Sequence, residues 1–215
     1  MRPSFIPDRT QRELRDLTRT RTTLIDERSA AVNRLQEVLE DANLKVASVA
    51  TDVMGVSGRA MLRAILAGET DPAALAALAK GKLRKKRVEL ERALGGRVSA
   101  HHRCLLATHL AHIDFLSAQI DGLDETIARF DEEIARRCAA DDREALIELL
   151  DTIPGIGRAM AELLIAELGV DMTRFPTPGH LAAWAGVAPG NNERGGRPRA
   201  ARTRQGNAWL KTALV

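Results

Sequence analysis

The sequence contains no tyrosine, and aromatic residues of all kinds make up only 3% of it. Leucine, alanine and isoleucine must therefore fill the core, and these residues favour helices over sheets. Cys104 and Cys138 are isolated, which excludes a disulfide framework and a cysteine-based zinc site. No apolar run has membrane-spanning length, and the first residues lack the hydrophobic region of a signal peptide. We therefore expect a cytoplasmic protein.

Charge is nearly balanced over the whole chain, where 32 Lys and Arg residues face 29 Asp and Glu residues for a net charge of +3. A uniformly basic protein is thus excluded, and a local excess of cations is more informative than the total. The segment Lys80–Arg87 fits a surface that binds a phosphate backbone and a solvated helix equally well. Near the C-terminus, Glu193 is outnumbered by basic residues: Arg194, Arg197, Arg199, Arg202, Arg204 and Lys211.

Apolar periodicity predicts an all-α fold. Asp8 suits the N-cap of a long helix that ends near Asp41, and glycines divide the stretch 43–95 into several short helices. A second long helix, 99–137, carries a heptad seam: His109, Ile113, Leu116, Ile120, Leu123, Ile127, Phe130 and Ile134. This seam predicts a helical hairpin or coiled coil. Its partner is either the first long helix or a second polypeptide, which is another copy of the chain or a full-length relative.

A polar break at 139–142 predicts the boundary between a helical region, 1–138, and a C-terminal domain, 139–215. In that domain, two short helices flank Ile153-Pro154-Gly155-Ile156-Gly157, which is the pattern of a helix-hairpin-helix. Gly155 and Gly157 permit positive φ and leave the backbone uncovered, so amides at the start of the second helix can face a phosphate oxygen. Arg158 adds a positive charge. The alternative is a tight helix connection without a ligand.

The basic strip at 189–206 follows this hairpin and is rich in glycine and arginine. Guanidinium groups bind phosphates in a bidentate manner, so we expect Arg197, Arg199, Arg202 and Arg204 to hold a second stretch of backbone. Such contacts position DNA without reading its bases. The alternative is a solvated loop. The candidate DNA-binding set is Gly155, Gly157, Arg158, Arg197, Arg199, Arg202 and Arg204.

Long motifs in the chain resemble the insertion-sequence transposases of the IS116/IS110/IS902 type. The C-terminal resemblance covers LLDTIPGIGRAMAELLIAELGVDMTRFPTPGHLAAWAGVAPGNNE and TRQGNAWLK. Upstream, the stretches 12–45, 53–69 and 109–125 resemble the central helical region of that family. The resemblance implies a DNA-binding protein that acts in DNA transposition or site-specific recombination. Because some members of the family are guided by a structured RNA, the resemblance also implies a guide RNA as a candidate partner.

The chain departs from the family pattern in three ways. Full members have an N-terminal RNase-H-like domain with metal-binding Asp and Glu residues, and this sequence begins after it, so we expect no metal or cofactor in this chain although the family resembles Mg-dependent enzymes. The last helix looks cut short. Arg194 occupies the position of the serine that the family uses as a nucleophile, and arginine cannot take that role. We therefore predict a transposase fragment that binds DNA, without catalytic residues of its own.

Other residue groups are better explained without a ligand. His109 and His112, or Glu144, Glu148 and Asp151, could hold a metal, but solvated side chains at helical spacing are far commoner. Trp184 and Trp209 fit core packing better than base stacking. Two rival functions stay open: a non-catalytic helix-hairpin-helix module for DNA binding or repair, and a coiled-coil interaction protein.

Overall fold

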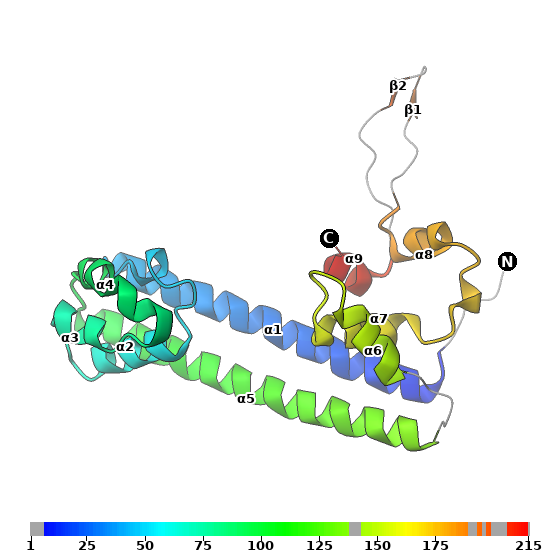
Figure 1. The fold of residues 1–215 in the computed structure, drawn as a ribbon, viewed down its shortest axis with the longest axis horizontal. Helices are drawn as coiled ribbons and strands as arrows, with labels where there is room; N and C mark the ends of the chain where they lie inside the picture. The colour runs from blue at the N-terminus through cyan, green and yellow to red at the C-terminus, as the bar shows by residue number, and fades with distance from the viewer. Residues whose placement is uncertain (1–6, 138–142, 189–192, 195–196, 199–205, 215) are drawn as a thin grey trace. The chain divides into compact units, whose positions relative to one another are not determined.

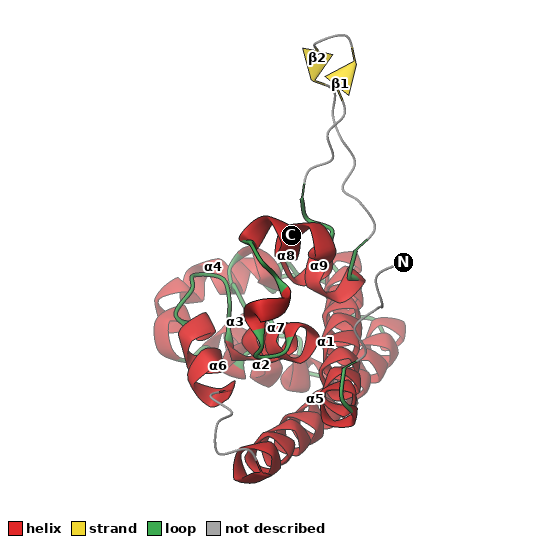
Figure 2. Cartoon of the chain, turned by 90° about the vertical axis from the view of Figure 1, so that its right-hand side faces the viewer, coloured by secondary structure: helices red, strands yellow, loops and turns green. Residues whose placement is uncertain are grey.

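A computed structural model describes residues 7–137, 143–188, 193–194, 197–198 and 206–214. The regular secondary structure of these residues is helical apart from two short strands, and loops connect the elements (Figure 2), which confirms the predicted all-α class. Candidates outside the described residues are Arg199, Arg202 and Arg204, and for Arg194 and Arg197 only the backbone is described. None of the described helices is long and apolar enough to cross a membrane.

Two long helices dominate the chain: α1, Arg9–Asp41, and α5, Ala100–Arg137. The predicted cap of α1 is confirmed, because the main-chain N–H of Gln11 donates to Oδ1 of Asp8 at 2.7 Å. By contact the chain divides into unit 1, Met1–Thr22 with Gly122–Val215, and unit 2, Thr23–Asp121. Both long helices run through both units, so each unit is described separately.

Unit 2 is built on the second part of α1 and the first part of α5, which run antiparallel. Leu35 and Leu39 of α1 share one core with Leu110, Ile113 and Leu116 of α5. The end of α1 meets the start of α5, where Asp41 Oδ2 lies 2.9 Å from His102 Nε2. Short helices complete this unit: η1 Val46–Ser48, α2 Val56–Leu66, α3 Pro72–Ala77, η2 Gly81–Lys86 and α4 Arg87–Ala93 (Figure 1).

The start of α3 combines two residues that favour a helix N-terminus. Pro72 occupies the first helical position, and the Asp71 carboxylate accepts the main-chain N–H groups of Ala73 and Ala74. Proline lacks the N–H that the first turn leaves unpaired, and an aspartate N-cap satisfies the next two. A helix of 6 residues forms here because both residues favour its beginning.

Unit 1 combines the first part of α1 and the second part of α5 with the C-terminal elements. Leu14, Ile127 and Ala166 form a buried cluster, against which Leu17 and Phe130 pack. The further elements are α6 Arg143–Asp151, α7 Arg158–Leu168, η3 Met172–Arg174, α8 Pro178–Ala185, β1 Glu193–Arg194, β2 Arg197–Pro198 and α9 Ala208–Leu214. The sequence placed its domain boundary at 138–139, whereas contact groups the first 22 residues with the C-terminal elements. The reason is that the buried side of α1 contacts α7.

The predicted heptad seam is a buried face of α5 over much of its length. Ile113 and Leu116 are buried in unit 2, and Ile127 is buried in unit 1. At the N-terminal end the core positions are Leu106 and Leu110 rather than His109, which is half-buried. Within each unit, α1 supplies the facing side chains. Pairing with a second polypeptide through a coiled coil stays a prediction.

Candidate nucleic-acid interface

The predicted hairpin is formed by α6 and α7, which pack against each other through Ile147, Ala161 and Ile165. The turn between them is closed by main-chain bonds from Ile153 N–H to Leu150 O, 3.0 Å, and from Ile156 N–H to Ile153 O, 2.9 Å. Gly169 ends α7 at φ 77°. The apolar side of each helix is thus buried, and the turn is left at the end of the pair.

The two turn glycines have different roles. Gly155 adopts φ 93°, a left-handed conformation that favours glycine. Gly157 permits positive φ but does not use it here: it is the N-cap of α7 with φ −92° and ψ 169°, an extended conformation open to any residue. A Cβ at either glycine would meet nothing within 4 Å. The turn backbone is therefore uncovered by the described residues.

The first turn of α7 is held in place but keeps an open N-terminus. The Gly157 carbonyl accepts the N–H groups of Met160 and Ala161, at 2.9 and 3.0 Å. Among the described residues no side chain caps the helix, and residues 157–159 are exposed. An uncapped helix start carries a partial positive charge from its free amides. The location is therefore electrostatically suited to an anion.

Arg158 lies beside this turn but is already paired. Its Nη1 is 2.8 Å from Glu144 Oε1, and its Nε is 3.0 Å from Glu162 Oε1. The bond to Glu144 raises the pKa of Arg158, and the same bond lowers the pKa of Glu144. The Arg158 side chain is 54% exposed, so it remains within reach of a ligand. Two carboxylates nevertheless offset its charge, which the sequence alone did not indicate.

Behind the turn, Arg21 of α1 fixes the start of α7. The Arg21 side chain is 4% exposed and its guanidinium contacts the Glu162 carboxylate, with a further bond from Nη1 to Asp124 Oδ1 at 3.0 Å. Its Nη2 also donates to the Ala159 carbonyl at 2.8 Å. Arg21 therefore holds α7 through one carboxylate and one main-chain carbonyl.

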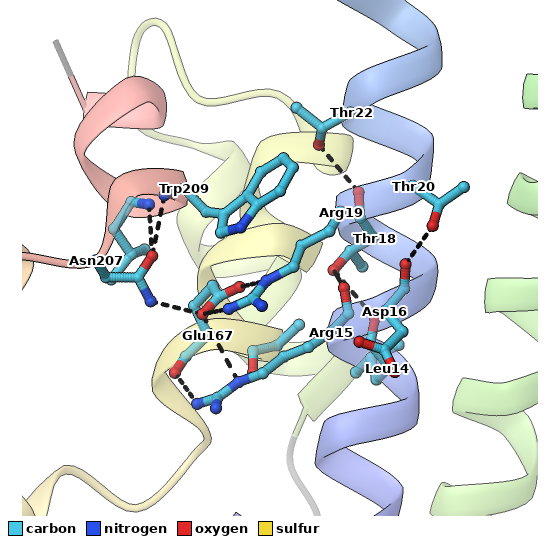
Figure 3. Close-up of polar contacts among 12 residues, drawn as sticks. Leu14, Arg15, Asp16, Thr18, Arg19, Thr20, Thr22, Glu167, Asn207 and Trp209 are labelled. Carbon is cyan, nitrogen blue, oxygen red and sulfur yellow. Dashed lines mark hydrogen bonds and ion pairs between the residues drawn. The ribbon is translucent and has the colours of Figure 1, made fainter.

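The other end of α7 is held by the buried Glu167 (Figure 3). Arg19 Nε and Nη2 bind the two oxygens of the Glu167 carboxylate at 2.5 and 2.9 Å. Arg15 Nε donates to the Ala166 carbonyl at 2.8 Å. Glu167 is 0% exposed, so both arginines neutralise a carboxylate that has no access to water. Residues of α1 thus anchor α7 along its length.

Glu167 also anchors the last helix. Its Oε2 accepts the side-chain amide of Asn207 at 2.6 Å, and the Asn207 Oδ1 accepts the N–H groups of Trp209 and Leu210. Asn207 is therefore the N-cap of α9. The Arg19 guanidinium lies 5.6 Å from the centre of the Trp209 ring, within the range of a cation–π contact (Figure 3). Trp209 is half-buried and contacts a protein cation, whereas Trp184, which was also expected to pack in the core, is 42% exposed.

The basic strip begins and ends at one place. Gly186, which caps α8 at φ 79°, precedes it. Gly206 is its last residue and approaches so closely that a Cβ there would lie 2.4 Å from the Gly186 nitrogen. Within the strip, β1 pairs antiparallel with β2, Arg194 opposite Arg197. The two ends of the segment are thus held together, although the predicted contacts of its arginines lie outside the described side chains.

Four residues of this network were not predicted from the sequence: Arg15, Arg19, Glu167 and Asn207. A signal was present: α7 is apolar except for Arg158, Glu162 and Glu167, and a glutamate on a buried helix requires a cation. Among the described residues no group of three or more His, Cys, Asp or Glu side chains is arranged to hold a metal. Glu144, one of the acids considered for such a role, is bound to Arg158.

Comparison with known proteins agrees with this domain. The model of the family described as "Transposase IS116/IS110/IS902 family" matches residues 147–215. A "Probable family 20 transposase" of Pseudomonas aeruginosa is 26% identical over 219 aligned residues, which cover 100% of this chain and 53% of that protein. An "Insertion element IS116 uncharacterized 44.8 kDa protein" of Streptomyces clavuligerus is 34% identical over 82 residues, 38% of this chain and 20% of that protein. The chain thus spans about half the length of the first relative. No solved structure matches.

Proposed function

The chain carries, at residues 147–215, the domain of the IS116/IS110/IS902 transposase family, and from this premise we propose that it binds DNA as part of an insertion-sequence transposase. In this proposal the C-terminal domain contacts the phosphate backbone of DNA and not the edges of its bases. Binding should therefore depend weakly on DNA sequence and strongly on salt.

The observation that carries the proposal is the open α6–α7 turn. Gly155 and Gly157 place no side chain over the turn, and the first amides of α7 have no side-chain cap among the described residues. A helix start of this kind accepts a phosphate oxygen without rearrangement. Arg21 and Glu162 support it from behind, so the turn can stay in place when a ligand binds.

The basic strip would supply a second contact. On either side of its arginines, Gly186 and Gly206 approach each other closely. In the proposal Arg197, Arg199, Arg202 and Arg204 contact phosphates next to the stretch held by the α6–α7 turn. Each phosphate that they neutralise would release a counterion from the duplex.

The proposal places the catalytic residues in another domain or subunit. Arg194 stands where the family places its nucleophilic serine, and the guanidinium cannot attack a phosphodiester. We propose that this chain binds DNA without cleaving it alone. Strand transfer would need carboxylates and a metal from another domain or subunit. A guide RNA and a second copy of the chain, paired through α1 and α5, are further partners in this proposal.

The test is a fluorescence anisotropy titration of a labelled duplex in a series of salt concentrations. The double variant Arg197→Ala with Arg199→Ala should lower the slope of log K against log salt by about 2. It should weaken binding alike for unrelated sequences. The control removes two exposed cations from the long helices, Arg12→Ala with Arg129→Ala, and should change the slope far less.

A second variant tests the α6–α7 turn itself. Glu144→Gln removes one of the two carboxylates that offset Arg158, so it should strengthen DNA binding. Glu148→Gln, on the same helix, is the control. Wild-type binding without any salt dependence would contradict the proposal and favour an interaction protein. Equal effects of Glu144→Gln and Glu148→Gln would show that the α6–α7 turn does not contact DNA.

A further inference from the structure

Unit 2 exposes a run of cations that have no ion pair with any residue in the described part of the chain. The six residues are Lys80, Lys82, Arg84, Lys85, Lys86 and Arg87, and all of them are exposed. Within the residues that the structure describes, none of the six makes a salt bridge. Six like charges in eight positions repel one another, so the folded protein retains here an unfavourable arrangement that an anionic partner would relieve.

A pocket of about 610 Å³ lies against this run. Lys80, Lys82 and Lys86 line it together with Asp52, and its apolar lining includes Leu83. The segment η2 is a 3-10 helix with three residues per turn, so residues three apart lie on one face. Leu83 and Lys86 therefore share one face of η2, and Lys80 lines the same pocket from the N-cap position just before the helix.

Local contacts hold the pocket walls. The main-chain N–H of Lys80 donates to Ser57 Oγ at 2.9 Å, which ties the start of the run to α2. Lys86 Nζ donates to the Val49 carbonyl at 3.3 Å. Gly81, at φ 56°, allows the chain to turn directly into η2. The lysines thus extend from a fixed backbone and not from a free loop.

We propose that the segment Lys80–Arg87 and its pocket form a second surface for the phosphate backbone of duplex DNA, separate from the C-terminal domain. Lysine binds phosphate as a point charge and carries no base specificity. No aromatic side chain lines the pocket, so it lacks the stacking platform that single-stranded nucleic acids require. Exposed cations on successive turns suit the regular spacing of phosphates along a duplex.

The first test removes three cations whose side chains make no hydrogen bond in the described part of the chain: Lys82→Ala, Arg84→Ala and Lys85→Ala. The full chain should lose about tenfold or more in affinity for a duplex at about 100 mM salt, with a slope of log K against log salt lower by about 2 to 3. The matched control, Arg34→Ala with Arg63→Ala and Arg97→Ala, removes three exposed charges elsewhere in unit 2. An effect no larger than that of the control would overturn the proposal.

The same series separates this surface from the C-terminal one. The triple variant and the Arg197→Ala, Arg199→Ala variant are measured singly and together. A loss in the triple variant alone supports the second surface and contradicts the C-terminal assignment. A loss of affinity in the double variant alone supports the C-terminal assignment and contradicts the second surface. Duplex RNA, single-stranded DNA and polyglutamate serve as competitors, and stronger competition by any of them than by duplex DNA would overturn the choice of ligand.

A variant that strengthens DNA binding provides a further check, because a folding defect would weaken binding. Asp52 lines the pocket and its Oδ1 accepts the Met54 N–H at 2.8 Å. Asp52→Asn keeps that acceptor and removes a negative charge, so it should tighten duplex binding by about two- to fivefold, an effect that high salt abolishes. Asp71→Asn also keeps a helix cap, lies outside the pocket lining, and is the control. Unchanged or weaker binding in Asp52→Asn would contradict the proposal.

Discussion

The arginines of unit 1 and the cations of the 80–87 run in unit 2 are similar in sequence but differ in structure. Arg15, Arg19 and Arg21 each contact a carboxylate that is nearly or fully buried. The cations of the 80–87 run are exposed, and in the described part of the chain none of them has an acidic partner. The first group consolidates the fold, whereas the second is available to a partner.

This difference shows that the number of cations in a segment does not reveal its role. A guanidinium that neutralises a buried carboxylate contributes to folding, and removing either partner leaves an uncompensated charge. An exposed lysine contributes little to folding and keeps its charge for a ligand. The two groups should therefore respond in opposite ways in stability and in binding measurements, and the following variants test this.

Glu167→Ala should have the largest effect. It leaves the half-buried guanidiniums of Arg15 and Arg19 without their carboxylate and removes the anchor of Asn207, with an expected loss of about 3–5 kcal/mol in the free energy of unfolding. Both tryptophans, Trp184 and Trp209, belong to unit 1, so urea unfolding followed by tryptophan fluorescence reports on this unit. Glu125→Ala, an exposed glutamate of α5, is the control. Equal losses in the two variants would refute the assignment.

Arg21→Ala should have the next largest effect. Glu162 would lose one of its two arginine partners, but Arg158 remains, and Asp124 is half-exposed and can be hydrated. We expect a loss of about 2 kcal/mol by the same fluorescence measurement. Arg21→Lys should recover only part of it, because one ammonium group cannot reach both the carboxylates and the Ala159 carbonyl. Full recovery would show that charge alone matters at this position.

Asp131 adds a pH dependence to unit 1. Burial raises the pKa of Asp131 from 3.8 to about 6, although Arg143 opposes this. The folded state thus holds the proton more tightly than the unfolded chain. This contribution to stability is complete below about pH 4 and is lost as the pH rises through about 6. Asp131→Asn should flatten this pH dependence by about 1 kcal/mol, the effect being reduced by solvent screening. Urea unfolding between these pH values measures it, with Asp16→Asn as the control.

The smallest effect on stability is expected in the 80–87 run. Lys82→Ala with Lys85→Ala should change the free energy of unfolding by no more than about 0.5 kcal/mol, measured by circular dichroism during urea unfolding. The matched pair in unit 1, Arg15→Ala with Arg19→Ala, removes the same charge and should cost several times more, because Glu167 is buried. Similar losses of stability in both double variants would show that the arginines of unit 1 and the cations of the 80–87 run do not differ in their contribution to folding.

Local features were readily predicted from the sequence. Asp8 was identified as a cap because its side chain acts on an amide three residues away. Gly155 was identified because a hairpin between two apolar helices needs a turn. The role of Arg158 could not be predicted fully, since its partner Glu144 lies on another helix and either residue alone resembles an ordinary surface charge. Arg15 and Arg19 looked like solvated residues of a charged helix for the same reason.

The sequence by itself determined the helical class, the two long helices, the N-cap of the first and the α6–α7 turn. Those features depend on side-chain periodicity and on contacts within a few residues. Only the tertiary structure decided which cations are neutralised, because a pair such as Arg19 and Glu167, 148 residues apart, forms only when their helices pack. The packing of α1 against α7 therefore separates the arginines that stabilise the protein from the lysines that remain open to a ligand.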